Sequence, residues 1–191
     1  MLTVVSVDQA SWADLQAIFG DRGDPARCRC QYFKDTPAEW RSGTSAERAE
    51  RLRAQTADRA TGLVAFLDGE PAGWCAVEPR TAYRRLRTSR LVWADRDEDP
   101  ADDGVWAVTC FVTRKGFRRQ GVSAALAKAA VGFARERGAR AVEGYPMLVE
   151  PGQKVAWPAE LFVGTAGIFA DAGFSEVSRP TARRVVMRLT C

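Results

Sequence analysis

The sequence predicts an α/β (α+β) protein with one central, mixed and twisted β-sheet of about six to seven strands, flanked by helices on both faces. Three observations carry this prediction. Residues 105–113 form an almost unbroken apolar and β-branched run, which is typical of a strand covered on both faces. A short basic turn with two glycines and an amphipathic helix follow directly. The other predicted strands and helices come in an order that suits a mixed sheet, and 191 residues suit a single domain over 1–191.

The opening part of the chain predicts one strand and three helices. The strand spans residues 2–7, and Asp8 is expected to cap the helix that Gly20 ends. Residues 20–35 show no periodic pattern and are predicted to be irregular. The next two helices have clear start signals, which are a threonine before a proline and a threonine–glutamate capping box. These signals begin at Thr36 and Thr44.

A β-hairpin, a helical turn and an acidic loop are predicted before the buried strand. Apolar runs at 62–67 and 71–78 flank an Asp68-Gly69 turn, which is a strong hairpin signal. Residues 81–89 predict a helical turn. Residues 95–104 hold six acidic side chains and a proline. They therefore predict an exposed, solvated loop, which could also steer a cationic acceptor.

The helix after the buried strand has one apolar stripe. Its apolar residues are spaced by four, three and four from Val122, and Gly138 follows its end. Residues 146–163 are long for a connection and contain Trp157, so we expect them to be functional or locally structured. The other elements predicted here are a strand over 140–145, a helix over 164–172, and hairpin strands over 175–178 and 184–190.

Composition argues against several classes of protein. A hydrophobic fraction of 46% with 27% charged residues is ordinary for a globular protein. No apolar run reaches membrane-spanning length, and the first residues lack the pattern of a signal peptide. Five scattered cysteines argue against a disulfide framework and for a reducing cytoplasm. The net charge of +4 comes with no nucleic-acid-binding motif, and the absence of histidine removes a common base and metal ligand.

The turn between the buried strand and the amphipathic helix is a candidate phosphate site. The first N–H groups of a helix have no partner within it, and the helix dipole adds partial positive charge there. Gly121 lets a ligand approach the backbone, Ser123 is small, and two arginines add positive charge. From these residues alone, an ordinary strand–turn–helix joint with a solvated basic turn is an equal alternative.

The spacing in this turn resembles that of a known family. The GNAT superfamily of N-acetyltransferases has a pyrophosphate loop of pattern Q/R-x-x-G-x-G/A. The similar sequence in this chain, with serine in place of the final glycine or alanine, is Arg118-Arg119-Gln120-Gly121-Val122-Ser123. The strand before, the helix after and a later Gly173-Phe174 extend the resemblance over residues 62–190. The chain lacks the Walker and Rossmann glycine patterns.

The resemblance implies acetyl-CoA as the cofactor. The loop would hold its pyrophosphate, and the preceding strand, splayed from its neighbour, would offer backbone groups to the pantetheine amides. Phe169 stands where family members commonly have a tyrosine that protonates the leaving thiolate, and its ring would pack against the pantetheine arm. The implied cofactor-binding residues are Cys110, Phe111, Val112, Thr113, Arg118, Arg119, Gln120, Gly121, Val122, Ser123 and Phe169.

Acetyl transfer to an amine also needs a proton acceptor and a proton donor. The candidate bases are Glu143 in the fifth predicted strand and Glu78 at the end of the third, where burial would raise the pKa of the carboxyl group. For both glutamates, the alternative to a catalytic base is a hydrogen-bonded polar side chain at the end of the sheet, and this alternative is at least equal. With phenylalanine at position 169, water or Tyr145 is left to act as the acid.

The cysteine and tryptophan side chains could pack in the core instead of forming part of a functional site. Cys110 is expected to be a small buried side chain rather than a nucleophile, because no histidine is present to activate it. Cys28 and Cys30 are expected to pack or to line a substrate pocket, and no metal site is expected. Four tryptophans are candidates either for an acceptor cavity or for the core: Trp74, Trp93, Trp106 and Trp157.

Two functions follow from the sequence. The first is an N-acetyltransferase that moves an acetyl group from acetyl-CoA to a primary amine of a small molecule or peptide, by direct attack in a ternary complex. The alternative is a GNAT-fold sensor or interaction module that binds acyl-CoA with little catalytic activity, which the missing tyrosine keeps open. Neither nucleic acid nor a membrane is an expected partner. The identity of the acceptor and the formation of a homodimer stay open.

Overall fold

The computed structural model describes residues 1–149 and 158–191. Seven strands of this described part form one sheet in the order β1-β2-β3-β4-β5-β7-β6. Neighbours are antiparallel except β4 and β5, which are parallel. The predicted mixed sheet is therefore confirmed. The strands are β1 (Leu2–Ser6), β2 (Gly62–Leu67), β3 (Glu70–Pro79), β4 (Val105–Thr113), β5 (Ala141–Gly144), β6 (Ser175–Thr181) and β7 (Arg184–Thr190).

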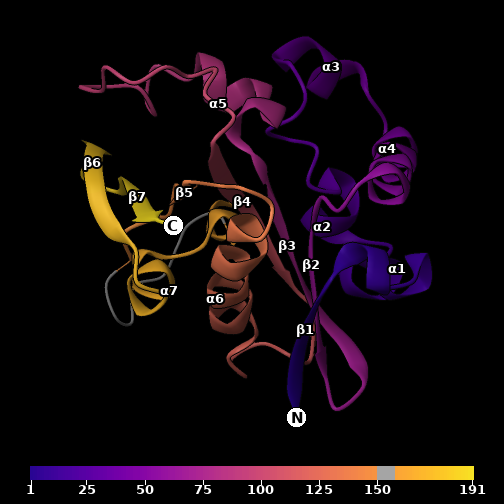
Figure 1. Cartoon of the computed structure of the whole chain (residues 1–191). Coiled ribbons are helices and arrows are strands. Elements are labelled where there is room, and N and C mark those ends of the chain that lie inside the picture. Colours follow the sequence, from indigo (N-terminus) through magenta and orange to yellow (C-terminus); the bar gives the residue numbers. More distant parts are fainter. Residues whose placement is uncertain (150–157) are drawn as a thin grey trace.

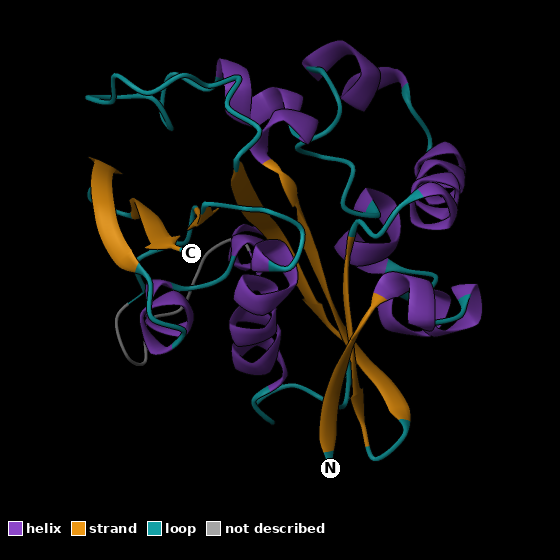
Figure 2. Cartoon of the chain, in the orientation of Figure 1, coloured by secondary structure: helices purple, strands orange, loops and turns teal. Residues whose placement is uncertain are grey.

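Helices cover both faces of the sheet, and Figure 2 shows them separately from the strands. In Figure 1, α6 and α7 lie on one face, α1, α2 and α4 on the other, and α3 and α5 at the upper end. The α-helices are α1 (Trp12–Phe19), α2 (Gly23–Cys28), α3 (Pro37–Ser42), α4 (Ser45–Asp58), α5 (Arg84–Thr88), α6 (Val122–Arg135) and α7 (Ala166–Asp171). The short 3-10 segments are η1 (Val7–Gln9), η2 (Arg80–Ala82) and η3 (Pro158–Val163).

Capping residues fix where the N-terminal helices begin. Thr36 and Thr44 each form a capping box with the glutamate three residues later, so both predicted starts are confirmed. The start predicted for the first helix is wrong. Ser11 caps α1, and Asp8 lies in the 3-10 turn before it. The segment predicted to be irregular, 20–35, contains α2, which at six residues is too short to show helical periodicity.

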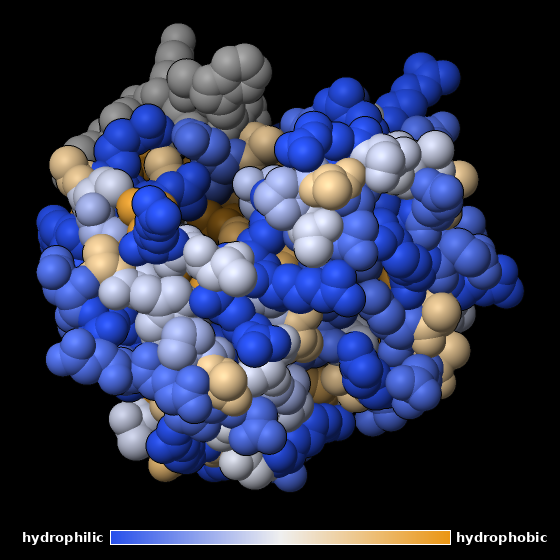
Figure 3. Space-filling model, turned by 90° about the horizontal axis from the view of Figure 1, so that it is seen from above, coloured by the Kyte–Doolittle hydropathy of each residue, from blue (hydrophilic) through white to orange (hydrophobic). Residues whose placement is uncertain are grey.

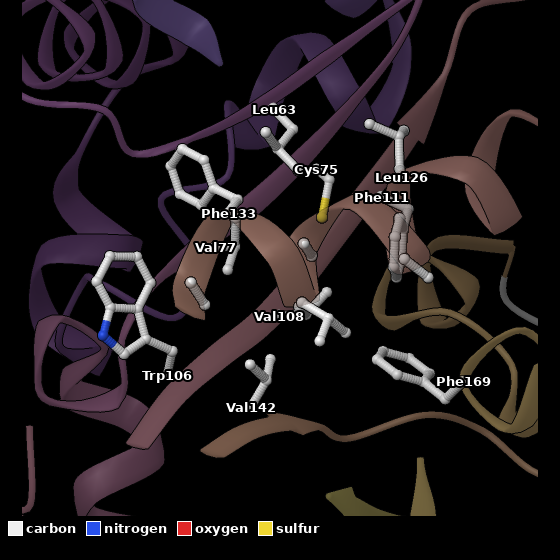
Figure 4. Close-up of a cluster of buried hydrophobic side chains, with 14 of the residues drawn as sticks. Leu63, Cys75, Val77, Trp106, Val108, Phe111, Leu126, Phe133, Val142 and Phe169 are labelled. Atoms are coloured by element: carbon white, nitrogen blue, oxygen red, sulfur yellow. The ribbon is translucent and has the colours of Figure 1, made fainter. Parts of the chain in front are cut away.

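The main core lies between α6 and the sheet (Figure 4). The apolar stripe of α6 packs against β2, β3 and β4, and the ring of Phe133 meets the edge of Trp106 at a centroid distance of 6.0 Å. Phe169 of α7 completes this cluster and packs against Phe111 at 5.8 Å. A second cluster lies on the other face, where α1 covers the ring of Trp74. The stripe predicted from the spacing in α6 is therefore the face that the core buries.

The acidic segment over 95–104 is a loop, as predicted, but it is not exposed along its whole length. Arg96 turns inward, and its side chain is only 4% exposed. Glu98 follows it and contacts Arg96 at 3.0 Å. A run of charges indicates a solvated loop only when its side chains have no buried partners, and this loop has such partners in the site described below.

Candidate active site

β4 and β5 separate part-way along their length. Their parallel pairing ends at Val108 and Gly144, whereas β4 continues to pair with β3 up to Thr113. Pro146 has no N–H to donate to a strand, and the N–H of Met147 bonds to the segment before α7 at 3.1 Å. The edge of β4 beyond Val108 that faces β5 therefore has no strand partner within the described residues. Backbone groups on such an edge can bind an extended ligand.

A β-bulge in β4 lies at the point of separation. Val77 pairs with Val108 and Ala76 pairs with Cys110, so Thr109 is an extra residue opposite β3. A bulge bends the strand and changes the direction of nearby side chains. Thr109 and Cys110 line a cavity on the face opposite α6. No feature of the sequence marks this bulge.

The loop between β4 and α6 forms a cradle at the N-terminus of a 14-residue helix. Gly121 is the N-cap, with φ of +77°, and no side chain of the described residues caps the helix. A Cβ built on Gly121 would meet no described atom within 4 Å, so the space in front of the helix is open. Gln120 braces the loop by donating to the carbonyl of Gly116 at 2.9 Å. This geometry fits the binding of a phosphate group.

The predicted cofactor residues fall into three groups in the structure. Cys110 to Thr113 lie on the part of β4 that β5 leaves, with the first three side chains buried. Arg118 to Gln120 are exposed at the loop, and the Ser123 hydroxyl lies 3.2 Å from that of Thr113. Phe169 is fully buried in the core on the α6 side, where its ring packs against Gly144. Only residues 114–117 separate the first two groups along the chain.

A cavity of about 970 Å³ lies at the other end of the separation. The cradle is at the lower end of α6 in Figure 1, whereas α3 and α5, which contribute to the cavity, are at the upper end. Seen from above, the surface is hollowed near its centre, with apolar side chains in the depth of the hollow (Figure 3). Thr109, Cys110 and Tyr145 line the cavity where the strands part. The cradle and the cavity therefore reach β4 from opposite ends.

Glu143 lies in a buried ion cluster. Its fully buried carboxylate accepts hydrogen bonds from Arg188 at 3.0 Å, from Arg80 at 3.4 Å and from Arg96. Burial raises the pKa of Glu143, but the charges of Arg96 and Arg188 and the hydrogen bonds to the carboxylate outweigh it, so the pKa lies below its ordinary value of 4.5. The raised pKa expected from the sequence is wrong here, because three arginines surround the carboxylate.

Tyr145 joins this cluster to the cavity. Its hydroxyl donates to Oε2 of Glu143 at 2.8 Å, and the residue lines the cavity wall. Burial and the nearby charge of Glu143 raise the pKa of Tyr145 well above its ordinary value, so the hydroxyl stays protonated at neutral pH. Glu78, the other candidate base, is 2% exposed, pairs with Lys34 and with Arg59 at 3.2 Å, and is not part of the cavity wall.

Two thiols of the cavity wall, those of Cys28 and Cys110, are protonated at neutral pH. A hydrogen bond with Cys30 and burial raise the pKa of Cys110 well above its ordinary value, and burial raises the pKa of Cys28 to about 11. Cys28 and Cys30 both line the cavity, as one of the alternatives for them predicted. Within the described chain, no cluster of cysteine, aspartate or glutamate is placed to hold a metal ion.

The three candidate tryptophans that the structure describes do not line the cavity. Trp74 and Trp106 are core residues, and the ring of Trp93 lies 4.7 Å from the guanidinium groups of both Arg80 and Arg96. Trp157 lies outside the described residues. The cavity instead uses Trp40 of α3, a residue that no pattern in the sequence marks. No described helix is long and apolar enough to cross a membrane.

A model of the acetyltransferase (GNAT) family matches residues 26–147 of the chain. No curated protein matches it. Among solved structures, an N-acetyltransferase from Staphylococcus aureus Mu50 has a TM-score of 0.57 at 12% identity, with 100% of this chain and 98% of that one covered. An aminoglycoside acetyltransferase in complex with coenzyme A has a TM-score of 0.53 at 18% identity, with 100% and 95% covered.

A third solved structure, the ribosomal-protein-alanine N-acetyltransferase from Brucella melitensis, has a TM-score of 0.53 at 17% identity, with 99% of both chains covered. At these identities the similarity establishes the fold. The matches extend over the whole sheet and both helical layers.

Proposed function

Because the chain belongs to the GNAT acetyltransferase family, we propose that it is an N-acetyltransferase that moves an acetyl group from acetyl-CoA to a primary amine. The observation that carries this proposal is the separation of β4 from β5, with a phosphate cradle at one end and a cavity at the other. Two reactants that enter from opposite ends would meet beside the bulge in β4. Holding them there makes the attack effectively unimolecular.

The residues of the chain fit acetyl-CoA in two places. The N-terminus of α6 and the exposed guanidinium groups of Arg118 and Arg119 would hold its pyrophosphate. The unpartnered edge of β4, from Cys110 to Thr113, would offer N–H and carbonyl groups to its amides. The thioester of the bound molecule supplies an activated acetyl group. A backbone N–H of β4 near Phe111 would polarise its carbonyl.

Direct attack by the amine suits the side chains at the end of the cavity. The bond from nitrogen to the acetyl carbon forms as the carbon–sulfur bond breaks, so the nitrogen loses a proton and the thiolate gains one. Tyr145 lines this end, but its hydroxyl donates its single proton to Glu143 and its raised pKa makes it a weak acid, so we assign protonation of the thiolate to water in the open cavity. Glu143 positions that hydroxyl and, with its lowered pKa, is a poor base. Water in the open cavity accepts the amine proton.

The protonated state of Cys28 and Cys110 argues against an acyl-enzyme route. The thiolate is the nucleophilic form of cysteine, and the raised pKa of Cys110 keeps that form scarce at neutral pH. The chain also has no histidine to remove the proton. Transfer within a ternary complex therefore fits the site better than a covalent intermediate.

Release of free CoA from acetyl-CoA, measured across several classes of amine, tests this function. We expect turnover with at least one class, and a kcat in Tyr145→Phe within about threefold of the wild type, with unchanged affinity for acetyl-CoA. A fall in kcat of about tenfold or more in this variant would assign the proton donor to Tyr145 instead. Acetyl-CoA binding without CoA release for any amine would favour the sensor or interaction module instead, and would agree with the phenylalanine at position 169.

A further inference from the structure

The charges on the cavity wall identify a chemical class for the acceptor. Among the residues that the structure describes, the charged residues of this wall are Asp24, Glu160, Arg27, Arg48, Arg85 and Arg184. Both carboxylates already have arginine partners: Asp24 pairs with Arg27, and Glu160 lies 3.8 Å from Arg184. The described part of the wall thus keeps two guanidinium groups in excess of its carboxylates. A cavity with this balance favours a ligand that carries negative charge.

The two remaining guanidinium groups differ in their partners. Arg48 lies 3.8 Å from the carboxylate of Asp35 and donates to the backbone carbonyls of Trp40 and Gly43. Arg85 has no carboxylate within salt-bridge distance in the part of the chain that the structure describes. Its charge is therefore available to a ligand.

Arg85 is fixed in place without being neutralised. Its Nε donates to the carbonyl of Asp35 at 3.0 Å, its Nη2 lies 3.5 Å from that of Thr36, and its guanidinium stacks over the ring of Tyr32 at 4.2 Å. Carbonyl oxygens and an aromatic ring hold the group but carry no net charge. The Nη1 donors have no hydrogen-bond partner among residues 1–149 and 158–191. A pre-positioned guanidinium of this kind binds carboxylates well.

The rest of the wall suits an apolar body. Aromatic and aliphatic side chains make up most of it, among them Tyr32, Phe33, Trp40, Leu86, Leu91 and Phe162. The volume of about 970 Å³ lies at the upper end of the range for small-molecule sites, so it exceeds what a small amine fills. The polar groups of Thr109 and Tyr145 lie where β4 and β5 part, which is where the amine must be.

From these observations, and resting on the proposed function, we propose that the acceptor is an amine with a carboxylate and an apolar body, as in an apolar amino acid or a short peptide. Arg85 binds the carboxylate, the aromatic wall holds the body, and the amine reaches the end of the cavity beside Tyr145. A polyamine or other cationic acceptor, which the acidic loop alone would suggest, would meet excess positive charge in this cavity.

The test compares acceptors that differ in the carboxylate alone. The probes are phenylalanine, leucine and their dipeptides, the amides of the same compounds, and spermidine as a cationic amine. CoA release gives KM and kcat for each, and calorimetry with CoA present gives acceptor affinity. We expect the carboxylates to have the lowest KM, and the comparison of amino acids with dipeptides identifies the length that fits.

Three variants separate binding of the carboxylate from a structural role of Arg85. Arg85→Gln removes the charge and keeps a donor for the carbonyl of Asp35, Arg85→Lys keeps the charge, and Arg87→Gln is a matched control on an exposed residue of the same helix. For carboxylate acceptors, KM should rise about tenfold or more in Arg85→Gln, be partly restored in Arg85→Lys, and stay unchanged in the control. For the amides, KM should change less than about twofold, because no charge pairs with Arg85.

The outcomes distinguish this inference from the proposed function. The inference would be overturned if amides or spermidine had KM values equal to or below those of the carboxylates. It would also be overturned if Arg85→Gln changed the KM of acid and amide equally. Either result would leave the proposed acetyltransferase activity intact. Taking the variant-to-wild-type ratio for each acceptor removes the difference in amine pKa between acids and amides. Absence of CoA release with every probe and other amine classes would overturn both.

Discussion

Replacement of Gly121 by valine tests the cradle at the start of α6. Gly121 has φ of +77°, a conformation that side chains with a Cβ disfavour. The space around the position is open, because a Cβ there meets no atom of the described residues within 4 Å. The Cβ of a valine would therefore clash with no described residue beyond the neighbours in sequence. It would occupy the space that a bound pyrophosphate needs.

The expected magnitudes follow from this geometry. A residue other than glycine in the left-handed region costs roughly 1–2 kcal/mol, which for a chain of this length lowers Tm by about 2–8 °C. The effect on acetyl-CoA binding should be larger, since the side chain removes the close approach to the first N–H groups of α6. We expect a loss of at least about a hundredfold in affinity, which corresponds to about 2.7 kcal/mol.

Gly138→Val provides the matched control. Gly138 follows the other end of α6, has φ of +84°, and likewise has open space around its Cβ position. Both variants therefore carry a similar backbone penalty, and only Gly121→Val fills the cradle. Thermal unfolding should give similar falls in Tm, and calorimetry should show weakened acetyl-CoA binding in Gly121→Val alone. Equal and normal affinities in both variants would refute the assignment of the cradle.

Two further predictions concern stability. Gly144→Ala should lower the free energy of unfolding by about 1–3 kcal/mol, because its Cβ would lie 2.2 Å from Cε1 of the fully buried Phe169. Gly132 is exposed in α6, and Gly132→Ala should raise the free energy of unfolding by about 0.5–1 kcal/mol. Urea unfolding that ranks the two variants the other way would contradict the packing. The pKa of Glu143 is lower in the folded protein than its ordinary 4.5, so its contribution is present above pH 4.5 and is lost as pH falls through the folded value. The difference in Tm between the wild type and Glu143→Gln should therefore narrow between pH 6 and pH 3, and a constant difference would count against the ion cluster.

Signals that lie within a few residues of one another predicted most of the fold. The capping boxes at Thr36 and Thr44, the Asp68-Gly69 turn and the apolar run of β4 each depend on neighbours in sequence. The start of α1 was also within reach of the sequence, because Ser11 is followed three residues later by aspartate, which completes the box. α2 was not, since six residues cannot show a helical period.

The residues of the candidate site likewise fall into those that a local sequence pattern marks and those that no local pattern marks. The cradle is one continuous stretch, so its spacing was visible in the sequence. The partners of Glu143 come from a 3-10 turn, an acidic loop and the last strand, and no local pattern connects Arg80, Arg96 and Arg188. The sequence therefore left Glu143 as an isolated carboxylate in an apolar strand, and the direction predicted for its pKa was wrong. The same holds for Arg85, whose lack of a carboxylate partner among residues 1–149 and 158–191 appears only in three dimensions.

The ion cluster also explains how the sheet can open without dividing in two. Only four residue pairs join β4 to β5, so the two halves of the sheet share a short seam. Arg80 follows β3 on one side of the seam, Glu143 lies in β5 on the other, and Arg188 stands directly opposite Glu143 in β7. Removing one member of such a buried set costs about 3–5 kcal/mol, because the others lose their counter-charge. Arg96 and Glu98 bring the acidic loop into the same set. The cluster thus holds the two halves together at the closed end, and the separation is confined to the end of β4 that the substrates need.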